Sequence, residues 1–471
     1  MSQLIDVMRT QYLRLPASVK AAIAPAFSIL PFSARFGRNY KNIREDIARS
    51  ETDAHFVQQY QLSILRLLIS RASIRSRHFT PLIRKHFGPT FDPSTFTIGD
   101  LSSLPILTKA EIIDDPESFL IAEPGNYDIR STSGSSGRAP AKIYLDRGRS
   151  VREMAFLHHI WSRIGYRLGD GRAVLRDYAG HSGRLKTTWR YDPSLRELWL
   201  SPFQLNEPTI DLYLELLDRY QVRFLYSHPS ALSIVARQVL RRQWKPPSSL
   251  RGILAASESL FSHQHQLIEK CFGVPAMAHY GMSERVAIAG EVVGSPGVYE
   301  FEPLYGMVEL LDDSGQPVTA PGRRGKLVST GLFSQAMALI RYDTGDRATL
   351  VRSATPENRF RMRVSNIRSR WNQEFVIGYD GQKIPVISLD QENYFGIFKE
   401  YQYVQSVPGL AVFRVVPCAG VSKTEVNRAV DTFRDKVRGI IDFELEIVPD
   451  IPTGLTGKRN FVLQQIPNAY D

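Results

Sequence analysis

Hydrophobic residues recur every three to four positions in the N-terminal region, which is the spacing of an amphipathic helix. The stretch FVQQYQLSILRLLISRA shows this spacing at Phe56, Tyr60, Ile64 and Leu67. The N-terminal region, to about residue 90, is therefore expected to be helical. Further along, Thr108 precedes Glu111 by three positions, which predicts a capping box at the start of a short helix that Pro116 would end.

From about residue 128 to 340 the pattern alternates between short apolar runs and helical periodicity. The runs RAVLRDY, VRFLYSHP and LRGILAASE are typical of buried strands. The stretches TIDLYLELLDRY, SALSIVARQVLRRQ and SHQHQLIEKCFG have the periodicity of helices. Such alternation predicts an α/β domain with a largely parallel sheet. From about 296 to 350, GVYEFEP, GMVELLDDSGQ and RRGKLVSTGL predict an antiparallel sheet or a small distorted β-barrel attached to it.

The last hundred or so residues predict a separate small unit. LAVFRVVP and FELEIVPDIP are strand-like, and a helix between them is opened by Ser422 with Glu425 at the capping-box spacing. The predicted fold class is therefore α/β, with a large N-terminal domain over residues 1–366 and a small α+β lid domain over residues 367–471.

Composition narrows the class of protein. With 471 residues, 43% hydrophobic and 23% charged, the chain is typical of a globular protein of two or three domains rather than a disordered one. The net charge of +11 favours an anionic partner, namely a nucleic acid, an acidic lipid surface or a phosphate-bearing small molecule. Zinc-finger spacing and aromatic RNA-binding signatures are both missing from the sequence, which argues against nucleic acid.

Cysteine use and the N-terminal apolar run bear on the compartment. Cys271 and Cys418 are far apart and lack CxxC spacing, so we expect no disulfide framework and a cytoplasmic location. The run VKAAIAPAFSILPF is broken by Pro25 and is too short to span a bilayer, so no transmembrane segment is expected. Packing of this run against the body is favoured over a peripheral membrane contact.

The stretch STSGSSGRAP, residues 131–140, has two interpretations. It is either a flexible linker or a loop that wraps an anion with backbone N–H groups and hydroxyls. The Walker, dinucleotide-binding and serine-elbow patterns all fail here, because none matches the positions of Gly134 and Gly137. Taken alone, the stretch leaves both interpretations open.

Three later segments carry chemistry-bearing residues. AHYGMSERV places an aromatic ring, a hydroxyl and a carboxylate together, and IRYDTGDRATL places Asp343 and Asp346 around a Thr-Gly pair. GLTGKRN holds Lys458 after a glycine. Each has an ordinary explanation by itself: a short exposed turn, a hairpin turn and a surface lysine respectively.

In this order, the four segments resemble the motifs of the adenylate-forming superfamily, and within it the phenylacetate–CoA ligase group, including relatives in capsular polysaccharide clusters. LSSLPILTKAEI, LYSHPSALSIVARQ and ILAASESL support the resemblance, which covers about residues 35 to 465. It implies that ATP, with Mg²⁺, activates a carboxylic acid as an acyl- or aryl-adenylate, from which the acyl group is then transferred to coenzyme A. It also implies a homodimer.

The resemblance assigns roles to particular residues. The nucleotide-binding set is Thr132, Ser133, Gly134, Ser135, Ser136 and Gly137 at the β- and γ-phosphates, Ser257 and Glu258 between nucleotide and acyl group, Tyr280 with Gly281 at adenine, Ser283 at the α-phosphate, and Asp346 at the ribose. The catalytic set is Glu284 as the Mg²⁺ ligand, Arg370 at the domain junction, and Lys458 at the reacting carboxylate. His228 and His279 are placed to line the acyl pocket.

The chain also departs from the family pattern. Arg138 stands where the phosphate loop usually has lysine, and Gln373 stands where the hinge usually has an acidic residue. Two alternatives therefore stay open. In the first, an adenylating ligase would transfer the acyl group to an amine or hydroxyl acceptor in polysaccharide or secondary metabolism. In the second, the protein would be a catalytically degenerate scaffold of the same fold.

Overall fold

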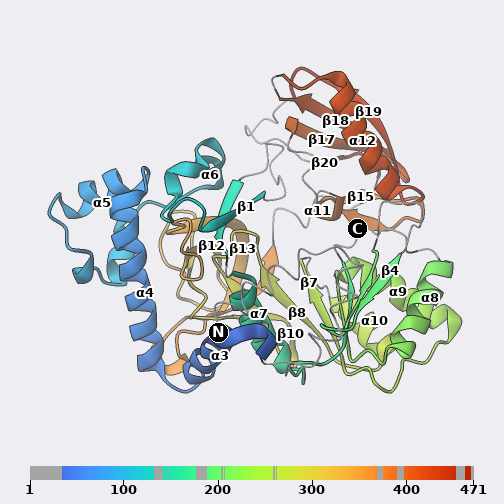
Figure 1. Ribbon diagram of the computed structural model, residues 1–471, viewed down its shortest axis with the longest axis horizontal. Coiled ribbons are helices and arrows are strands. Elements are labelled where there is room, and N and C mark those ends of the chain that lie inside the picture. The colour runs from blue at the N-terminus through green and yellow to red at the C-terminus, as the bar shows by residue number, and fades with distance from the viewer. Residues whose placement is uncertain are drawn as a thin grey trace.

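The computed structural model describes residues 34–131, 142–147, 149–176, 188–202, 205, 207–257, 260, 262–368, 375–389, 397–418, 420–451 and 462–467. The helices and the strands are arranged as a large mixed body with a smaller C-terminal unit beside it (Figure 1). The apolar run at residues 19–32 lies outside the described residues.

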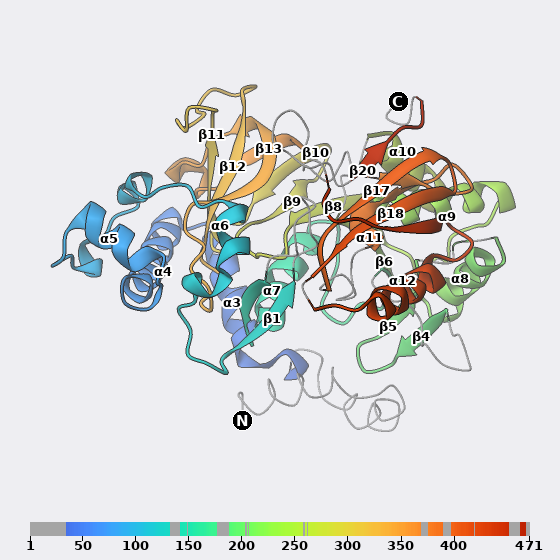
Figure 2. The same cartoon turned by 90° about the horizontal axis from the view of Figure 1, so that it is seen from above.

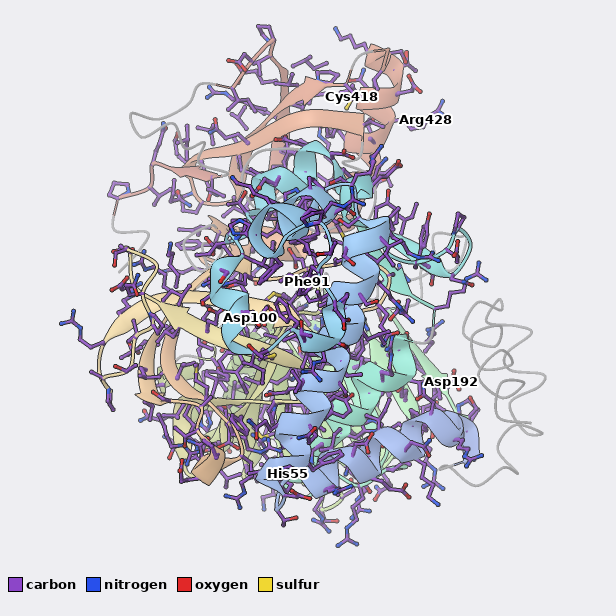
Figure 3. The ribbon with its side chains drawn as sticks, turned by 90° about the vertical axis from the view of Figure 1, so that its left-hand side faces the viewer. His55, Phe91, Asp100, Asp192, Cys418 and Arg428 are labelled. Carbon is purple, nitrogen blue, oxygen red and sulfur yellow. The ribbon has the colours of Figure 1, made fainter. Side chains whose placement is uncertain are left out.

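The described part of the N-terminal region is helical, as predicted. Its helices are η1 (Ala34–Phe36), α3 (Gly37–Ser50), α4 (Ala54–Arg75), α5 (Phe79–Phe87), η2 (Pro93–Thr95), η3 (Gly99–Ser103), α6 (Lys109–Asp114) and η4 (Pro116–Phe119). The capping box of Thr108 and Glu111 is confirmed, since each side chain bonds the other residue's backbone N–H. The rings of Phe87, Phe91 and Phe96 pack together with centroids 4.9 to 6.1 Å apart, on the face shown in Figure 3.

One twelve-stranded sheet forms the centre of the molecule, in the order β11-β12-β13-β14-β10-β9-β8-β7-β6-β3-β5-β4. Strands β5, β3, β6, β7 and β8 are mutually parallel, which confirms the predicted parallel core. The bounds of this half are β3 (Arg172–Leu175), β4 (Trp189–Asp192), β5 (Glu197–Leu200), β6 (Phe224–Ser227), β7 (Gly252–Ala256) and β8 (Ala276–Gly281).

Helices cover both faces of the parallel strands. Successive strand residues point to opposite sides of the sheet, and apolar side chains on each side pack against helices. On β7, Ile253 and Ala255 pack with α8 (Glu207–Arg219), α9 (Pro229–Arg242) and α10 (Ser262–Phe272). Leu254 faces the opposite side and packs in the cluster formed by α3 and α7 (Arg149–Ser162). The same alternation on β8 places Met277 with α7 and Ala278 with α10. The strands are therefore apolar on both faces, as expected of a buried parallel sheet.

The predicted barrel region is seen as an antiparallel run of strands that continues the same sheet. Its bounds are β9 (Ile288–Val292), β10 (Ser295–Phe301), β11 (Gly306–Leu311), β12 (Arg324–Gly331), β13 (Tyr342–Arg352) and β14 (Arg363–Arg368), with η5 at Pro356–Asn358. Strand β8 joins the two halves, because it pairs in parallel with β7 and antiparallel with β9. The separate two-stranded β1 (Tyr127–Ser131) and β2 (Lys142–Asp146) sheet is antiparallel.

The C-terminal unit is a four-stranded sheet, in the order β19-β18-β17-β20, packed against one helix. Its elements are β15 (Phe375–Ile377), β16 (Lys383–Pro385), α11 (Val386–Leu389), β17 (Phe398–Val407), β18 (Leu410–Pro417), α12 (Lys423–Val437), β19 (Asp442–Ile447) and β20 (Val462–Gln464). Both bonds of the predicted Ser422–Glu425 capping box are present. The unit lies over the end of the molecule that holds α8, α9 and α10 (Figures 1 and 2). The predicted boundary at residue 367 stays a prediction.

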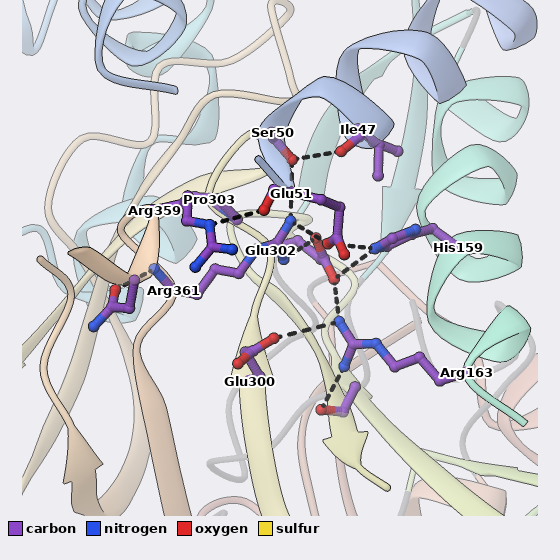
Figure 4. A network of polar contacts seen from close by, with 12 residues as sticks. Ile47, Ser50, Glu51, His159, Arg163, Glu300, Glu302, Pro303, Arg359 and Arg361 are labelled. Carbon is purple, nitrogen blue, oxygen red and sulfur yellow. Dashed lines mark hydrogen bonds and ion pairs between the residues drawn. The ribbon is translucent and has the colours of Figure 1, made fainter. Parts of the chain in front are cut away.

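A buried ion network fastens α3 and α7 to the loop after β10 (Figure 4). The carboxylate of Glu302 lies 2.8 Å from Arg361 and 2.6 Å from Arg163, and its side chain is 1% exposed. Glu51, just after α3, lies 2.8 Å from the same Arg361 and 3.3 Å from His159. Burial alone would raise the pKa of Glu302, but the charges of Arg361, His159 and Arg163 lower it to about 2.

Three further observations complete the fold. Among the described residues, none of the helices combines the length and hydrophobicity needed to cross a membrane. Cys271 and Cys418 are free thiols, as their spacing in the sequence predicted. The basic stretch on α4 and α5 contacts neighbouring elements, since Arg71 bonds Gln335, and Arg75 and Arg77 pair with Glu123 and Asp115.

Candidate active site

The predicted site residues that the structure describes gather where β8 ends and β13 begins. Tyr280, at the end of β8, donates a 2.6 Å hydrogen bond to Oδ2 of Asp346 on β13. Its ring packs edge-to-face on Phe301, with centroids 5.8 Å apart. Burial and the Asp346 carboxylate raise the pKa of Tyr280 well above its usual range, so the hydroxyl remains a donor at neutral pH. Two segments far apart in sequence thus meet here.

Asp346 lies in a bulge of β13. Between the pairs Lys326–Arg347 and Val328–Asp343, strand β13 carries more residues than β12. Gly345 has a φ of 77°, which favours glycine, and its N–H bonds the Asp343 carboxylate at 2.9 Å. The segment is therefore a bulge within a long strand rather than the hairpin turn that it suggests in isolation. Bulges of this kind aim side chains out of regular register.

Glu284 follows β8 and is buried among polar partners. Tyr342 donates a 3.0 Å hydrogen bond to Oε1 of Glu284, and Nζ of Lys109 lies 3.3 Å from the same oxygen. Ser283, one residue earlier, is exposed, as is Gly281. The turn therefore exposes Ser283 to solvent and buries Glu284 inside the protein.

The residues after Glu284 hold this turn in place. Arg285 has a φ of 55° and pairs with Glu153 of α7 at 3.2 Å. The carbonyl of Val286 accepts a 2.8 Å hydrogen bond from Ser329. Gly306 on β11 passes so close that an added Cβ would lie 1.9 Å from that carbonyl oxygen. A side chain at position 306 would therefore displace the turn that carries Glu284.

A second group of predicted residues lies at the carboxyl ends of β6, β7 and β8. The Trp161 indole N–H points to Nδ1 of His279 at 3.5 Å, and the ring of Tyr226 stacks on His279 with centroids 5.9 Å apart. Desolvation in this cluster, with the nearby Arg176 charge, lowers the pKa of His279 to about 3. His279 is thus neutral at physiological pH, and it cannot serve there as a charged anion-binding group.

Ser257 and His228 flank the same edge. Ser257 follows β7 with a φ of 69° and accepts a 3.0 Å hydrogen bond from Nη2 of Arg176, whose Nη1 donates to Tyr226 at 2.5 Å. His228 is buried, with Nδ1 3.3 Å from the Ala256 carbonyl. In parallel sheets, ligands bind at the carboxyl ends of the strands. Both histidines therefore lie at the edge where a substrate is expected.

Comparison with known proteins shows what the chain as a whole is similar to. No family model matches the chain. It is 21% identical to the protein CapK of Staphylococcus aureus over 398 residues, covering 83% of this chain and 85% of CapK. It is 24% identical to a phenylacetate–coenzyme A ligase of Pseudomonas putida over 335 residues, covering 68% and 72% of the two chains. The chain resembles the phenylacetate–coenzyme A ligase group. This confirms the resemblance expected from the four motifs.

Solved structures agree on the fold of these ligases. A 2-hydroxyisobutyryl-CoA ligase in its thioesterification state, with 2-HIB-AMP and CoA, matches with a TM-score of 0.58 at 19% identity, covering 89% of this chain and 92% of that one. The same ligase in a postadenylation state matches with a TM-score of 0.54 at 18% identity, covering 88% and 91%. The fold is that of the adenylate-forming ligases.

Several residues predicted from the resemblance to these ligases lie outside the described residues. They are Thr132, Ser133, Gly134, Ser135, Ser136, Gly137, Glu258, Arg370 and Lys458, with the departures Arg138 and Gln373. The frame around the first of these segments is described, because Ser131 at the end of β1 pairs directly with Lys142 at the start of β2. The residues that flank positions 132–141 therefore lie side by side in one antiparallel sheet.

The donor set at Glu284 fits the magnesium that these ligases imply. Mg²⁺ is usually held by one or two carboxylates together with substrate phosphates, rather than by a full protein cage. Glu284 offers one carboxylate for such a role. A single carboxylate is compatible with a Mg²⁺ ion that would be held jointly with substrate phosphates.

Sequence reasoning missed four residues of the site: Lys109, Trp161, Arg176 and Tyr226. Arg176 follows β3, and Tyr226 lies on β6, two positions before His228. A signal was present, because residues at the ends of predicted parallel strands share one edge of the sheet. For Lys109 and Trp161, the contacts cross between distant segments and leave no local pattern.

Proposed function

We propose that the protein is an ATP-dependent, AMP-forming acid–thiol ligase. In the first half-reaction, an oxygen of the substrate carboxylate attacks the α-phosphorus of ATP and pyrophosphate leaves. In the second, the thiol sulfur of coenzyme A attacks the acyl carbon and AMP leaves. The observation that carries the proposal is the meeting of Tyr280, Asp346 and Glu284 near the end of β8 and the start of β13, in a fold of this kind.

The nucleotide is proposed to bind along β8 and β13. Asp346 accepts hydrogen bonds from the ribose hydroxyls, the ring of Tyr280 stacks on adenine, and exposed Ser283 contacts the α-phosphate. Thr132 to Gly137 hold the β- and γ-phosphates with backbone N–H groups and hydroxyls. Glu258 is proposed to line the boundary of nucleotide and acyl group with Ser257, which lies at the end of β7.

The charge that builds up during adenylation explains the remaining residues. A carboxylate must approach an anionic phosphorus, and pyrophosphate departs with more charge, so positioned cations lower the barrier. Mg²⁺ held by Glu284 would supply part of this positive charge. Lys458 is proposed to reach the carboxylate and the α-phosphate from the C-terminal domain, over residues 367–471, and Arg370 to lie at its junction.

The acid is proposed to bind beside His228 and His279. These residues lie where the parallel strands end, and neutral His279 stacks on Tyr226 and packs at a tilt against Trp161. A hinge of the C-terminal domain would present Lys458 for the first half-reaction and withdraw it for the second.

The acceptor is tested by AMP formation. Purified protein is incubated with ATP, Mg²⁺ and a panel of aryl, fatty and hydroxy acids, with coenzyme A, an amine or an alcohol added separately. AMP formation that depends on coenzyme A supports the proposal. AMP formed only with an amine or alcohol would show that the acceptor is not coenzyme A.

A further inference from the structure

Lys109 contacts the proposed metal ligand directly. Its Nζ lies 3.3 Å from Oε1 of Glu284, the same oxygen that accepts the 3.0 Å hydrogen bond from Tyr342. The side chain of Glu284 is 7% exposed and that of Lys109 is 24% exposed. The ion pair is thus largely shielded from solvent, where charges interact more strongly than on a surface.

The backbone fixes Lys109 relative to Glu284. The N–H of Leu107 bonds the Arg341 carbonyl at 3.0 Å, and the N–H of Asp343 bonds the Leu107 carbonyl at 2.8 Å. These bonds flank Tyr342, the second partner of Glu284. The capping box that begins α6 then sets the chain direction at Lys109 itself. Two of the contacts to Glu284 therefore come from one joined unit, the start of α6 with the start of β13.

We propose that Lys109 is a positioning residue that balances the charge of Glu284 while no metal is bound, a role that Mg²⁺ held by Glu284 would take over. The inference rests on the proposed nucleotide site. Without Lys109, an unbalanced carboxylate would face the triphosphate and repel it. With metal bound, the same carboxylate is already neutralised. Loss of Lys109 should therefore weaken ATP binding mainly when no metal is present.

The test measures the dissociation constant of ATP by calorimetry, once in EDTA and once in excess Mg²⁺, for the full chain. The readout is the dissociation constant in EDTA divided by the dissociation constant in Mg²⁺. For Lys109→Met we expect the ratio to rise by about tenfold or more, because one unneutralised charge is added near the phosphates. Lys41→Met is the matched control, since Lys41 forms an exposed ion pair with Glu45 on α3, and its ratio should equal that of wild type.

A second set of variants separates positioning from direct phosphate contact. If Lys109 acts only by balancing the charge of Glu284, the double variant Lys109→Met with Glu284→Gln lacks both charges and should bind metal-free ATP within about threefold of wild type. A lysine that instead contacted the phosphates would leave the double variant weaker than wild type in EDTA, and Lys109→Met would weaken binding in Mg²⁺ as much as in EDTA, which would overturn the inference. Glu284→Gln alone should tighten binding in EDTA, and this prediction holds even if Lys109→Met fails to fold.

The outcomes distinguish this inference from the proposed function. If wild type binds ATP and Lys109→Met shows the same metal dependence as wild type, the inference is wrong but the proposed function still stands. Wild-type protein that binds no ATP in either buffer would contradict the proposed function and the inference together. Lys109→Arg, which keeps the charge, should keep the wild-type ratio within about threefold.

Discussion

The hydroxyl of Tyr280 donates a 2.6 Å hydrogen bond to the carboxylate of Asp346, although 66 residues separate the two in sequence. The bond crosses from β8, in the parallel half of the sheet, to β13, in the antiparallel half. It joins the two motifs that the resemblance assigns to the adenine and the ribose of one nucleotide, and the bulge at Gly345 sets the direction of the carboxylate.

Asp346→Ala should weaken ATP binding while the protein stays folded. Each lost hydrogen bond to a charged group costs about 1.5–3 kcal/mol, or roughly ten- to a hundredfold in affinity. Calorimetry with ATP and Mg²⁺ measures the effect. Asp313→Ala is the control, because Asp313 is an exposed carboxylate paired with Arg347. ATP affinity that is unchanged in Asp346→Ala would exclude the ribose contact.

Lys458→Ala should abolish adenylation and leave ATP binding nearly unchanged, because the lysine is proposed to act on the reacting groups alone. Formation of AMP in single-turnover reactions with a substrate acid measures the loss. Lys423→Ala, an exposed lysine at the start of α12 in the same unit, serves as the matched variant and should react normally. Near-normal AMP formation by Lys458→Ala would contradict the role proposed for Lys458.

His279 should make stability depend on pH. Its folded pKa of about 3 lies below the ordinary value of 6.5, so between these values the unfolded chain binds more protons than the folded one. Stability is therefore fully present above pH 6.5 and falls as the pH drops toward 3. At pH 5 the contribution lost is up to about 2 kcal/mol. Urea unfolding of wild type and His279→Asn at pH 7 and pH 5 should show a smaller pH effect in the variant, and equal effects would contradict a half-buried histidine that is neutral in the folded protein.

Glu302→Gln should destabilise the fold without touching the proposed nucleotide site. Removing one partner of a buried ion network costs about 3–5 kcal/mol, because Arg361 and Arg163 keep their charges. Chemical unfolding measures the change, with Glu446→Gln as the control. Glu446 pairs with Arg414 on the surface, where such pairs contribute about 0–1 kcal/mol. Equal losses in the two variants would mean that the network around Glu302 does not stabilise the fold.

The sequence predicted those features that local patterns encode. Apolar alternation located β6 and β7, and capping-box spacing located the starts of α6 and α12. Tyr280, Glu284 and Asp346 were predicted by their motif order, since spacing alone favoured ordinary turns. The bulge around Gly345 was not predicted, because a turn and a bulge use the same residues.

Contacts between distant segments could not be predicted from the sequence. Lys109 reaches Glu284 only because Leu107 pairs with the residues flanking Tyr342, and no periodicity encodes that pairing. Trp161 reaches His279 because α7 packs on the face of the sheet opposite α8. Such placements are set by the packing of the whole fold rather than by neighbouring residues.

The central claim is that the protein forms an adenylate, and ATP–pyrophosphate exchange tests it most directly. Labelled pyrophosphate, ATP and Mg²⁺ are incubated with the protein and each acid of the panel, without any acceptor. The account predicts that label enters ATP in the presence of at least one acid, and that Lys458→Ala abolishes this incorporation. A protein that binds ATP but incorporates no label with any acid would contradict the claim and would indicate a scaffold that keeps the fold without its chemistry.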